Sequence, residues 1–341
     1  MKETKLLPIT QESIDLAAEY LRQGTIFALP TETVYGIAAS AYNGEAVKDI
    51  FRAKGRPQDN PLIVHIAQMD MLYDLAREVS EDALKLAKAF WPGPLTMILP
   101  RSEKVADEVC AGLDTVGIRW PSHPVAQKVI LESGLPFAAP SANLSGSPSP
   151  TNARDVYQDM NGRLALILDG GESDVGVEST VVSMVEDTPV ILRPGYVTKE
   201  DLEGVLEKPV ALSHAILEKL GEGETARSPG MKYKHYAPKA QITILQGSLE
   251  KFREYVSKFE GQPGVFCLCF EGEETSLPLP CVTYGREGDG ASQAHDLFRS
   301  LRHLDEEGAV KVYARGPKQD GVSMAVYNRL LRAAAFQVVE L

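Results

Sequence analysis

The stretch FRAKGRPQDNPLIVHI, residues 51–66, leads from a helical segment through a polar loop into an apolar strand. A glycine and a proline break the chain, so the sequence places Lys54, Arg56 and Asn60 on a loop that can neither continue a helix nor begin a sheet. His65 follows on the strand PLIVHI. Two cations, an amide and an imidazole at one turn suit an anionic ligand, because arginine offers a planar fork to phosphate or carboxylate oxygens.

A second polar loop, PSANLSGSPSPT, occupies residues 140–151. It is rich in prolines, which favour a preorganised rim, although its side chains also suit a plain turn. The two loops together predict a nucleotide site without a Walker sequence, since the chain contains no GxxxxGK[ST] motif, and no GxSxG or HExxH motif either. The polar side chains of the second loop are Ser141, Asn143, Ser145, Ser147 and Ser149.

Length and composition predict two domains and a reducing cytoplasm. A chain of 341 residues exceeds what one hydrophobic core usually serves. No apolar run approaches the ~20 residues that span a bilayer, and the first residues lack the apolar region of a signal peptide.

The four cysteines form no CxxC pair and no set with histidines, which argues against zinc and against a disulfide scaffold. We expect Cys267 and Cys269 to share one face of a core strand. The net charge of −12 argues against a protein that coats nucleic acid.

Alternating apolar and amphipathic segments predict an α/β protein with a mixed sheet and flanking helices. Thr10 is expected to cap a helix that ends at Gly24. Several strands follow one another without a helix between them, so the sheet is not expected to be wholly parallel. The expected strands are TIFALP, PLIVHI, PLTMILP, TVGIRW, LPFAAP, RLALILD, STVVSMV and PVILRPG.

Composition changes near residue 220, where a Gly/Glu-rich and then basic stretch lacks an apolar face. We predict a first domain at residues 1–210, a linker at 211–239 and a second domain at 240–341. In the second domain the order β-α-β-β-α-β-α indicates a smaller Rossmann-like, doubly wound fold.

Polar residues on the expected strands are further candidates. Thr31 and Thr33 follow the first strand, either as ligand contacts or as a hydroxyl-rich turn. Arg119 lies inside the apolar strand TVGIRW and must find an anion, either a ligand carboxylate or an acidic residue. His65 alternates with apolar residues, a pattern more typical of a core histidine than of a base. Lys54 and Arg56 can also be read as solvated cations at a helix C-terminus.

Seven motifs carry a resemblance to a known family. PTETVYGIAA, KGRPQDNPLIVHI, WPGPLT, VGIRWP, PSANLSG, STVV and ILRPG, in this order, resemble the YrdC-type catalytic domain over about residues 6–207. The pairs Lys54/Arg56 and Ser141/Asn143 match its K-x-R and S-x-N signatures. The segment SPGMKYKHYAP and the Rossmann-like tail extend the resemblance to the two-domain threonylcarbamoyl-AMP synthase family.

The resemblance implies a nucleotidyltransferase that converts L-threonine, bicarbonate or CO2, and ATP into threonylcarbamoyl-AMP and pyrophosphate, with Mg2+ accompanying ATP. Its product would serve threonylcarbamoyladenosine modification of tRNA next to the anticodon, through a later enzyme complex. Direct contact with tRNA stays open. No membrane partner is implied, and the expected location is cytoplasmic.

The resemblance also implies site residues. Lys54 and Arg56 are expected in catalysis. The residues expected around ATP are Arg56, Asn60, Thr115, Ser141, Asn143, Ser149 and Arg193. Those expected around threonine are Thr33, His65, Arg119 on the carboxylate, the Ala139 backbone and Ser179. As a separate hypothesis, the basic, aromatic segment 232–236 folds over the nucleotide loops as a lid and brings Tyr236 near ATP.

Two other functions compete with this one. An RNA-binding YrdC-like module without adenylation activity would need exposed aromatics interleaved with cations, whereas the visible cations are few and lie in the loops. A carbamoyl-transfer domain of the hydrogenase-maturation type would bring zinc-finger cysteines that this chain lacks.

Overall fold

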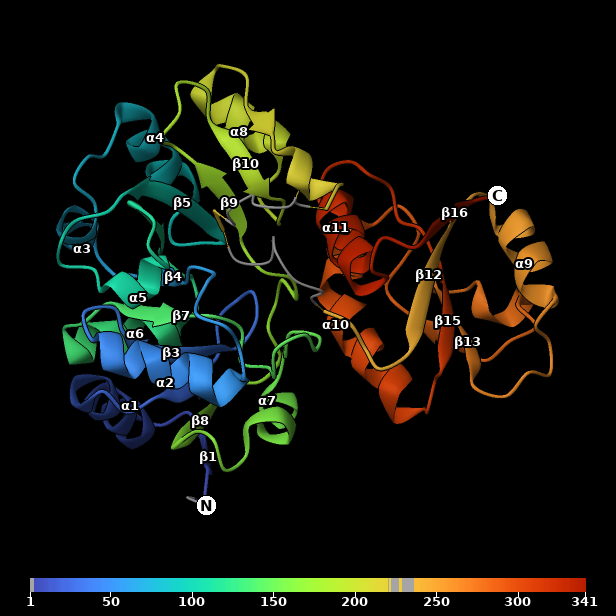
Figure 1. Ribbon diagram of the computed structural model, residues 1–341, viewed down its shortest axis with the longest axis horizontal. Helices are drawn as coiled ribbons and strands as arrows, with labels where there is room; N and C mark the ends of the chain where they lie inside the picture. Colours follow the sequence, from blue (N-terminus) through green and yellow to red (C-terminus); the bar gives the residue numbers. More distant parts are fainter. Residues whose placement is uncertain (1–2, 220, 222–226, 229–235) are drawn as a thin grey trace. The chain divides into compact units, whose positions relative to one another are not determined.

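A computed structural model describes residues 3–219, 221, 227, 228 and 236–341 (Figure 1). Contacts within the chain divide it into two compact units, each with its own sheet. The N-terminal unit comprises Met1–Ser145, Ser149–Asp174 and Glu178–Lys232, and the C-terminal unit comprises Gly146–Pro148, Val175–Val177 and Tyr233–Leu341.

The described part of the N-terminal unit is built on one mixed sheet of eleven strands, in the order β1-β8-β2-β3-β7-β4-β6-β5-β9-β10-β11. Parallel and antiparallel pairs alternate irregularly along it, so the predicted mixed α/β sheet is confirmed. The strands are β1 (Lys5–Pro8), β2 (Phe27–Leu29), β3 (Gly36–Ser40), β4 (Ile63–His65), β5 (Leu95–Pro100), β6 (Thr115–Arg119), β7 (Phe137–Ala139), β8 (Leu166–Asp169), β9 (Thr180–Ser183), β10 (Val190–Arg193) and β11 (Ala211–Leu212).

Helices flank this sheet, with α1 packed on α6 and α4 packed on α8. Helix α1 shows how the sequence sets a boundary: Thr10 accepts a hydrogen bond from the Ser13 amide, and Gly24 ends the helix at φ 74°. Both predicted ends are therefore confirmed. The helices are α1 (Gln11–Gln23), α2 (Gly44–Lys54), α3 (Met69–Leu75), α4 (Glu81–Phe90), α5 (Asp107–Cys110), α6 (Pro124–Ser133), α7 (Ala153–Met160) and α8 (Lys199–Leu206).

The register of the central strands brings polar residues together across the sheet. His65 on β4 pairs with Arg119 on β6 and with Phe137 on β7, and Arg119 pairs in turn with Thr96 on β5. Directly opposed residues on neighbouring strands point to the same face. Phe137, His65, Arg119 and Thr96 therefore form one row across the sheet.

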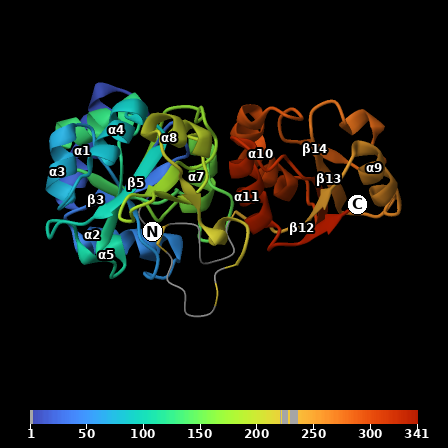
Figure 2. The ribbon, with the colours of Figure 1, turned by 90° about the horizontal axis from the view of Figure 1, so that it is seen from above.

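The C-terminal unit has a wholly parallel sheet in the order β14-β13-β15-β12-β16. Helices α10 and α11 cover one face and α9 covers the other, as both views show (Figures 1 and 2). The predicted Rossmann-like arrangement is thus confirmed, with β16 added at the edge. The elements are β12 (Gln241–Gln246), α9 (Leu249–Ser257), β13 (Val265–Cys269), β14 (Cys281–Thr283), α10 (Gly290–Glu306), β15 (Lys311–Arg315), α11 (Ser323–Ala333) and β16 (Val338–Glu340).

The region between the two sheets is only partly described. The start of the expected linker forms β11, paired with β10, and a short 3-10 helix at His214–Ile216. Of the expected lid, residues 232–235 lie outside the described residues. No helix among the described residues is long and apolar enough to cross a membrane.

Candidate functional site

Arg119 is the charged centre of the polar row, at the end of β6. Its side chain is 4% exposed and its Nη2 lies 2.6 Å from Oε1 of Glu32, whose side chain is 6% exposed. Its Nη1 donates to the Thr33 hydroxyl at 2.9 Å. Burial alone would raise the pKa of Glu32, but the pKa is lowered overall, chiefly by the nearby positive charge of Arg119. The two side chains therefore form a charged, buried pair.

This pair retains unused hydrogen-bonding capacity. The approach to Glu32 is close enough for an ion pair but lacks hydrogen-bond geometry, and Arg119 Nε and Nη2 find no hydrogen-bond acceptor within the described part of the chain. The sequence offered Arg119 two possible anions, a ligand carboxylate or an acidic residue. The structure is compatible with both, because Glu32 is an acidic partner and the guanidinium keeps donors to which a ligand carboxylate could bind.

His65 beside Arg119 is a neutral core histidine in this structure. Its ring stacks on Phe137 with 4.9 Å between centroids, and Nδ1 lies 3.1 Å from the Ile63 carbonyl oxygen. Burial, followed by the nearby charge of Arg119, lowers the pKa of His65 to about 3. A neutral imidazole therefore lines the row at physiological pH.

A second cation, Arg193, joins the row from β10. Its Nε donates to the Ser179 carbonyl at 3.1 Å and its Nη2 to the Ser179 hydroxyl at 3.1 Å. That hydroxyl lies 2.8 Å from the hydroxyl of Thr96, the register neighbour of Arg119. Just after Arg193, the backbone at Gly195 packs directly against Ser179 and Thr180. A side chain would not fit there, because a Cβ would lie 2.2 Å from the Thr180 amide nitrogen. Polar contacts thus link Arg193 through Ser179 to Thr96, which strand register places beside Arg119.

Lys54 differs from the expected loop cation. It is the last residue of α2, is 4% exposed, and donates through Nζ to the carbonyl oxygens of Ser141 and Asn143, the latter at 2.7 Å. Its own carbonyl accepts from the Ser145 amide at 3.0 Å. The expected loop position is therefore wrong, and of the alternative, a solvated cation at a helix C-terminus, the position is confirmed and the solvation is wrong. Gly55 takes the helix cap at φ 62°, and the helix turns Lys54 under the second polar loop.

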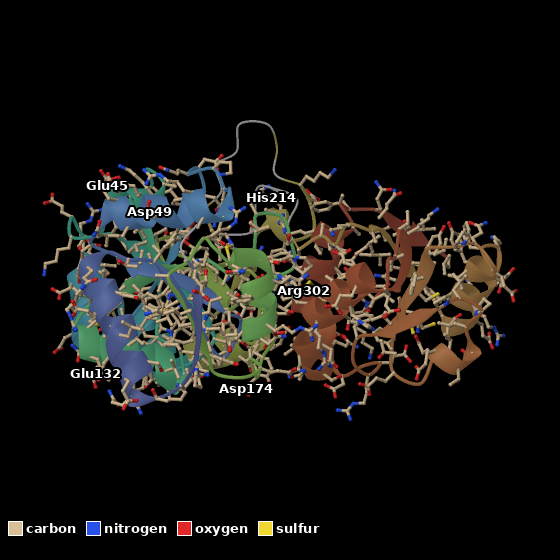
Figure 3. All side chains as sticks on the ribbon, turned by 90° about the horizontal axis from the view of Figure 1, so that it is seen from below. Glu45, Asp49, Glu132, Asp174, His214 and Arg302 are labelled. Carbon is tan, nitrogen blue, oxygen red and sulfur yellow. The ribbon has the colours of Figure 1, made fainter. Side chains whose placement is uncertain are left out.

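The charged side chains on the outer side of α2 differ from Lys54 in pairing with one another at the surface. Glu45 and Asp49 lie one turn apart on it (Figure 3) and form ion pairs with Lys48 and Arg52. Lys54 is buried and instead joins the two candidate nucleotide loops.

The second polar loop has one further anchor, Tyr35. The Ala142 amide donates to the Tyr35 carbonyl at 2.8 Å, and the Tyr35 amide donates to the Pro150 carbonyl at 3.0 Å. The Tyr35 hydroxyl donates to the Gly171 carbonyl at 2.7 Å. Both ends of the loop are thus held by one buried residue. Within the loop, the Ser141 hydroxyl donates to Oδ1 of Asn143 at 2.5 Å.

Arg56 and Asn60 face the start of the partly described region. Arg56 Nη2 donates to the Asn60 backbone carbonyl at 3.1 Å. The Asn60 amide is best oriented with its nitrogen toward the Ser228 carbonyl, at 3.2 Å, and its oxygen accepting from Arg56 at 3.1 Å. Ser228 is fully buried, so this part of the linker packs on the loop that carries Arg56.

The remaining expected residues lie in separate places. Thr115 begins β6, and with a rise of ~3.3 Å per residue it stands about 13 Å from Arg119 along the strand. Ala139 ends β7, and Ser149 donates to Oε1 of Glu178 at 2.5 Å. Tyr236 belongs to the C-terminal unit, where its ring lies 5.1 Å from that of Phe298.

Sequence reasoning missed four residues that shape the site: Glu32, Tyr35, Thr96 and Glu178. Glu32 and Tyr35 lie inside the quoted motif PTETVYGIAA, where a buried acid beside threonines was a usable signal. Thr96 and Glu178 are recognised only through strand register and contacts.

The described residues contain no group of three or more histidine, cysteine or acidic side chains arranged to hold a metal ion. Mg2+ is commonly bound through substrate phosphates and few protein carboxylates.

Comparisons with known proteins agree with these features. The family model described as telomere recombination, Sua5/YciO/YrdC, matches residues 19–195, and the model for the threonylcarbamoyl-AMP synthase C-terminal domain matches residues 197–335. Threonylcarbamoyl-AMP synthase of Bacillus subtilis is 45% identical, covering 98% of this chain and 97% of that protein. The Pyrococcus abyssi protein of the same name is 43% identical, covering 97% of each.

A solved structure extends the likeness to three dimensions. The crystal structure of P. abyssi Sua5 complexed with L-threonine matches with a TM-score of 0.92 and 41% identity, covering 100% of this chain and 99% of that chain. The family resemblance inferred from the motifs is thereby confirmed.

The Lys54 contacts lead to a stability prediction. Replacing Lys54 with Met leaves the Ser141 and Asn143 carbonyls without this donor, so we expect the free energy of unfolding to fall by about 2–4 kcal/mol. Urea unfolding followed by tryptophan fluorescence measures it, because both tryptophans, Trp91 and Trp120, lie in the N-terminal unit. Lys85→Met, which removes an exposed ion pair, is the matched control and should cost less than about 1 kcal/mol. Equal effects of the two changes would show that Lys54 is not a structural link.

The lowered pKa of His65 leads to a pH prediction. The unfolded chain takes up a proton near pH 6.5 while the folded chain resists protonation until about pH 3. The stability that the neutral His65 contributes is therefore complete above pH 6.5 and is lost as the pH falls toward 3. Wild type should lose stability relative to His65→Phe by up to about 1.4 kcal/mol per pH unit between pH 6 and 4.5. A stability difference that stays constant with pH would contradict the assignment.

Proposed function

We propose the function of this chain from one premise: the chain belongs to the Sua5/YciO/YrdC family, in its two-domain threonylcarbamoyl-AMP synthase form. It is an L-threonylcarbamoyladenylate synthase, EC 2.7.7.87, a nucleotidyltransferase that uses L-threonine, bicarbonate or CO2, and ATP. The product serves threonylcarbamoyladenosine modification of tRNA. This function replaces the alternatives of a plain RNA-binding module and a hydrogenase-maturation domain.

The reaction requires the protein to position its substrates, and it requires no nucleophilic side chain. The amine of threonine takes up CO2 as a carbamate, and a carbamate oxygen attacks the α-phosphorus of ATP. The bond from the α-phosphorus to the bridging oxygen breaks, and pyrophosphate leaves with the electron pair. Holding the carbamate and the phosphate in line can supply much of the rate, about 7–11 kcal/mol in favourable cases.

The observation that carries the proposal is the buried guanidinium of Arg119. We assign the threonine carboxylate to Nε and Nη2, because a carboxylate accepts two parallel bonds from this fork and neither nitrogen has a hydrogen-bond acceptor among the described residues. Nη2 would then face two carboxylates, since it also lies 2.6 Å from Oε1 of Glu32. Glu32 holds the fork in place, and the hydroxyl of Thr33 fixes its other end. Neutral His65, the Ala139 backbone and Ser179 would complete the threonine site.

The nucleotide side would be formed by the two polar loops and Arg193. Arg56 and Arg193 supply charge for the phosphates, and Asn60, Ser141, Asn143 and Ser149 supply polar contacts. Lys54 would act mainly by holding the second loop in place, because its ammonium group donates to a carbonyl oxygen of that loop. Thr115 lies about 13 Å from Arg119 along β6, so it would contact a part of ATP remote from threonine.

Mg2+ would enter bound to the ATP phosphates and offset their charge. The lid hypothesis for residues 232–236, with Tyr236 near ATP, stays a prediction, because residues 232–235 lie outside the described ones. Residues 1–210 would form the catalytic domain, 211–239 the linker and 240–341 the second domain. We place the protein in the cytoplasm, where a separate tRNA threonylcarbamoyltransferase complex would receive the adenylate.

The test is pyrophosphate release, which should require ATP, threonine and bicarbonate together. Arg119→Gln should weaken threonine binding by about 2–4 kcal/mol, roughly 30- to 800-fold, and leave ATP affinity within a few-fold, because only the carboxylate contact is lost. Isothermal titration of each substrate measures this.

Two controls accompany the experiment. Glu32→Gln with Arg119→Gln removes the buried pair together, so that no lone carboxylate disturbs the fold, and it should lose threonine binding as well. Arg77→Gln, which breaks an exposed ion pair, should bind threonine normally. Normal threonine affinity in a folded Arg119 variant would refute the site, and pyrophosphate release without threonine would refute the reaction.

A further inference from the structure

Three of the four cysteines gather on neighbouring strands of the C-terminal sheet, in a place that the proposed synthase reaction does not use. Cys267 and Cys269 lie two residues apart on β13 and therefore share one face. Cys281 begins β14, and the strand register sets it directly opposite Cys267. Opposed residues on neighbouring strands point to the same face, so the three cysteine side chains lie on one face of the sheet.

The spacing of the opposed pair suits a disulfide. Neighbouring strands lie about 4.8 Å apart, and disulfides join Cα atoms that are roughly 4.4–6.8 Å apart. Strand β14 is the edge strand of this sheet and is three residues long, so it can shift toward β13 without breaking a ladder on its other side. Cys269 lies on the diagonal, where the Cα separation is about 7–8 Å.

Exposure distinguishes the three thiols. Cys267 and Cys269 are fully buried, with Cys267 in the core cluster that includes Phe252 and Tyr313, whereas Cys281 is only half-buried at the rim of that cluster. A small polar oxidant would therefore reach Cys281 first and find Cys267 as the neighbouring thiol.

We propose that Cys281 and Cys267 form a redox-sensitive dithiol that a peroxide converts into an intramolecular disulfide. In the first step the Cys281 sulfur attacks one peroxide oxygen, the O–O bond breaks, and Cys281 becomes a sulfenic acid as hydrogen peroxide is reduced to water. In the second step the Cys267 sulfur attacks the Cys281 sulfur, and the sulfenic oxygen leaves as a second water with the Cys267 proton. Two thiols lose two electrons in total, and one peroxide gains them.

The experiment treats the full-length protein with a few equivalents of hydrogen peroxide and measures its intact mass and its thiol content. We expect a loss of two hydrogens per chain and a fall in titratable thiols from four to two. Proteolysis without reduction should yield one linked pair of peptides, carrying Cys267 and Cys281. Dithiothreitol should reverse all three changes.

Matched variants show which thiols react. Cys281→Ser should keep its three remaining thiols under the same treatment, while Cys110→Ser, which removes a buried thiol of the N-terminal unit, should still form the disulfide. Cys269→Ser should form it too. If Cys267→Ala folds, its Cys281 sulfenic acid should accumulate and react with dimedone. The wild-type peptide map decides the matter if that variant does not fold.

Four results would overturn the proposal. These are a linkage of Cys281 to Cys269, a linkage between two chains, the addition of oxygen atoms without a disulfide, and four thiols unchanged by peroxide.

Discussion

The ion pair between Arg119 and Glu32 is the constraint on which the site depends. A guanidinium buried in an apolar sheet is costly unless an anion compensates it, and Glu32 provides that anion at 2.6 Å. The pair forms only because the loop after β2 returns beside the end of β6. The same geometry leaves part of the guanidinium without a hydrogen-bond acceptor among the described residues, and the proposed contact with a second carboxylate rests on this observation.

Sheet register extends this constraint to the rest of the row. Because His65, Arg119 and Thr96 oppose one another on three adjacent strands, a shift of one residue in any strand would turn its polar group to the other face. Ser179 and Arg193 then continue the polar contacts from Thr96. Lys54 donates to a carbonyl oxygen within the second loop, and the Tyr35 backbone binds both ends of that loop. The candidate threonine site thus rests on strands, and the candidate nucleotide site rests on loops with structural anchors.

Much of the fold could be predicted because its signals are local. The cap at Thr10, the stop at Gly24 and the apolar strands need only neighbouring residues, and the structure confirms them. Strands β1, β3, β11 and β16 were missed. Of these, β1 and β16 are short and are recruited by a distant parallel partner, β8 or β12. For Lys54 the alternative of a helix C-terminus was right about the position, since a cation followed by glycine is typical of such an end. Its burial under the second loop depends on the tertiary fold and could not be predicted from neighbouring residues.

The partners within the site could not be predicted from spacing. The sequence showed that Arg119 needs an anion, but it could not identify Glu32, because that contact is made by the tertiary fold. It likewise gave no sign that Thr96 lies beside Arg119, which is a consequence of strand register. Residue types indicated the chemistry, and the sheet determined which of them meet.

The central claim is that Arg119 reads the carboxylate of threonine, and one comparison tests it directly. The affinities of L-threonine and of L-threonine amide, which lacks the negative charge, should be measured on wild type and on the doubly neutral Glu32→Gln/Arg119→Gln variant. The account predicts that wild type prefers threonine by at least about tenfold, since a charged hydrogen bond contributes roughly 1.5–3 kcal/mol, and that the variant shows little preference. An equal preference in both proteins would contradict it.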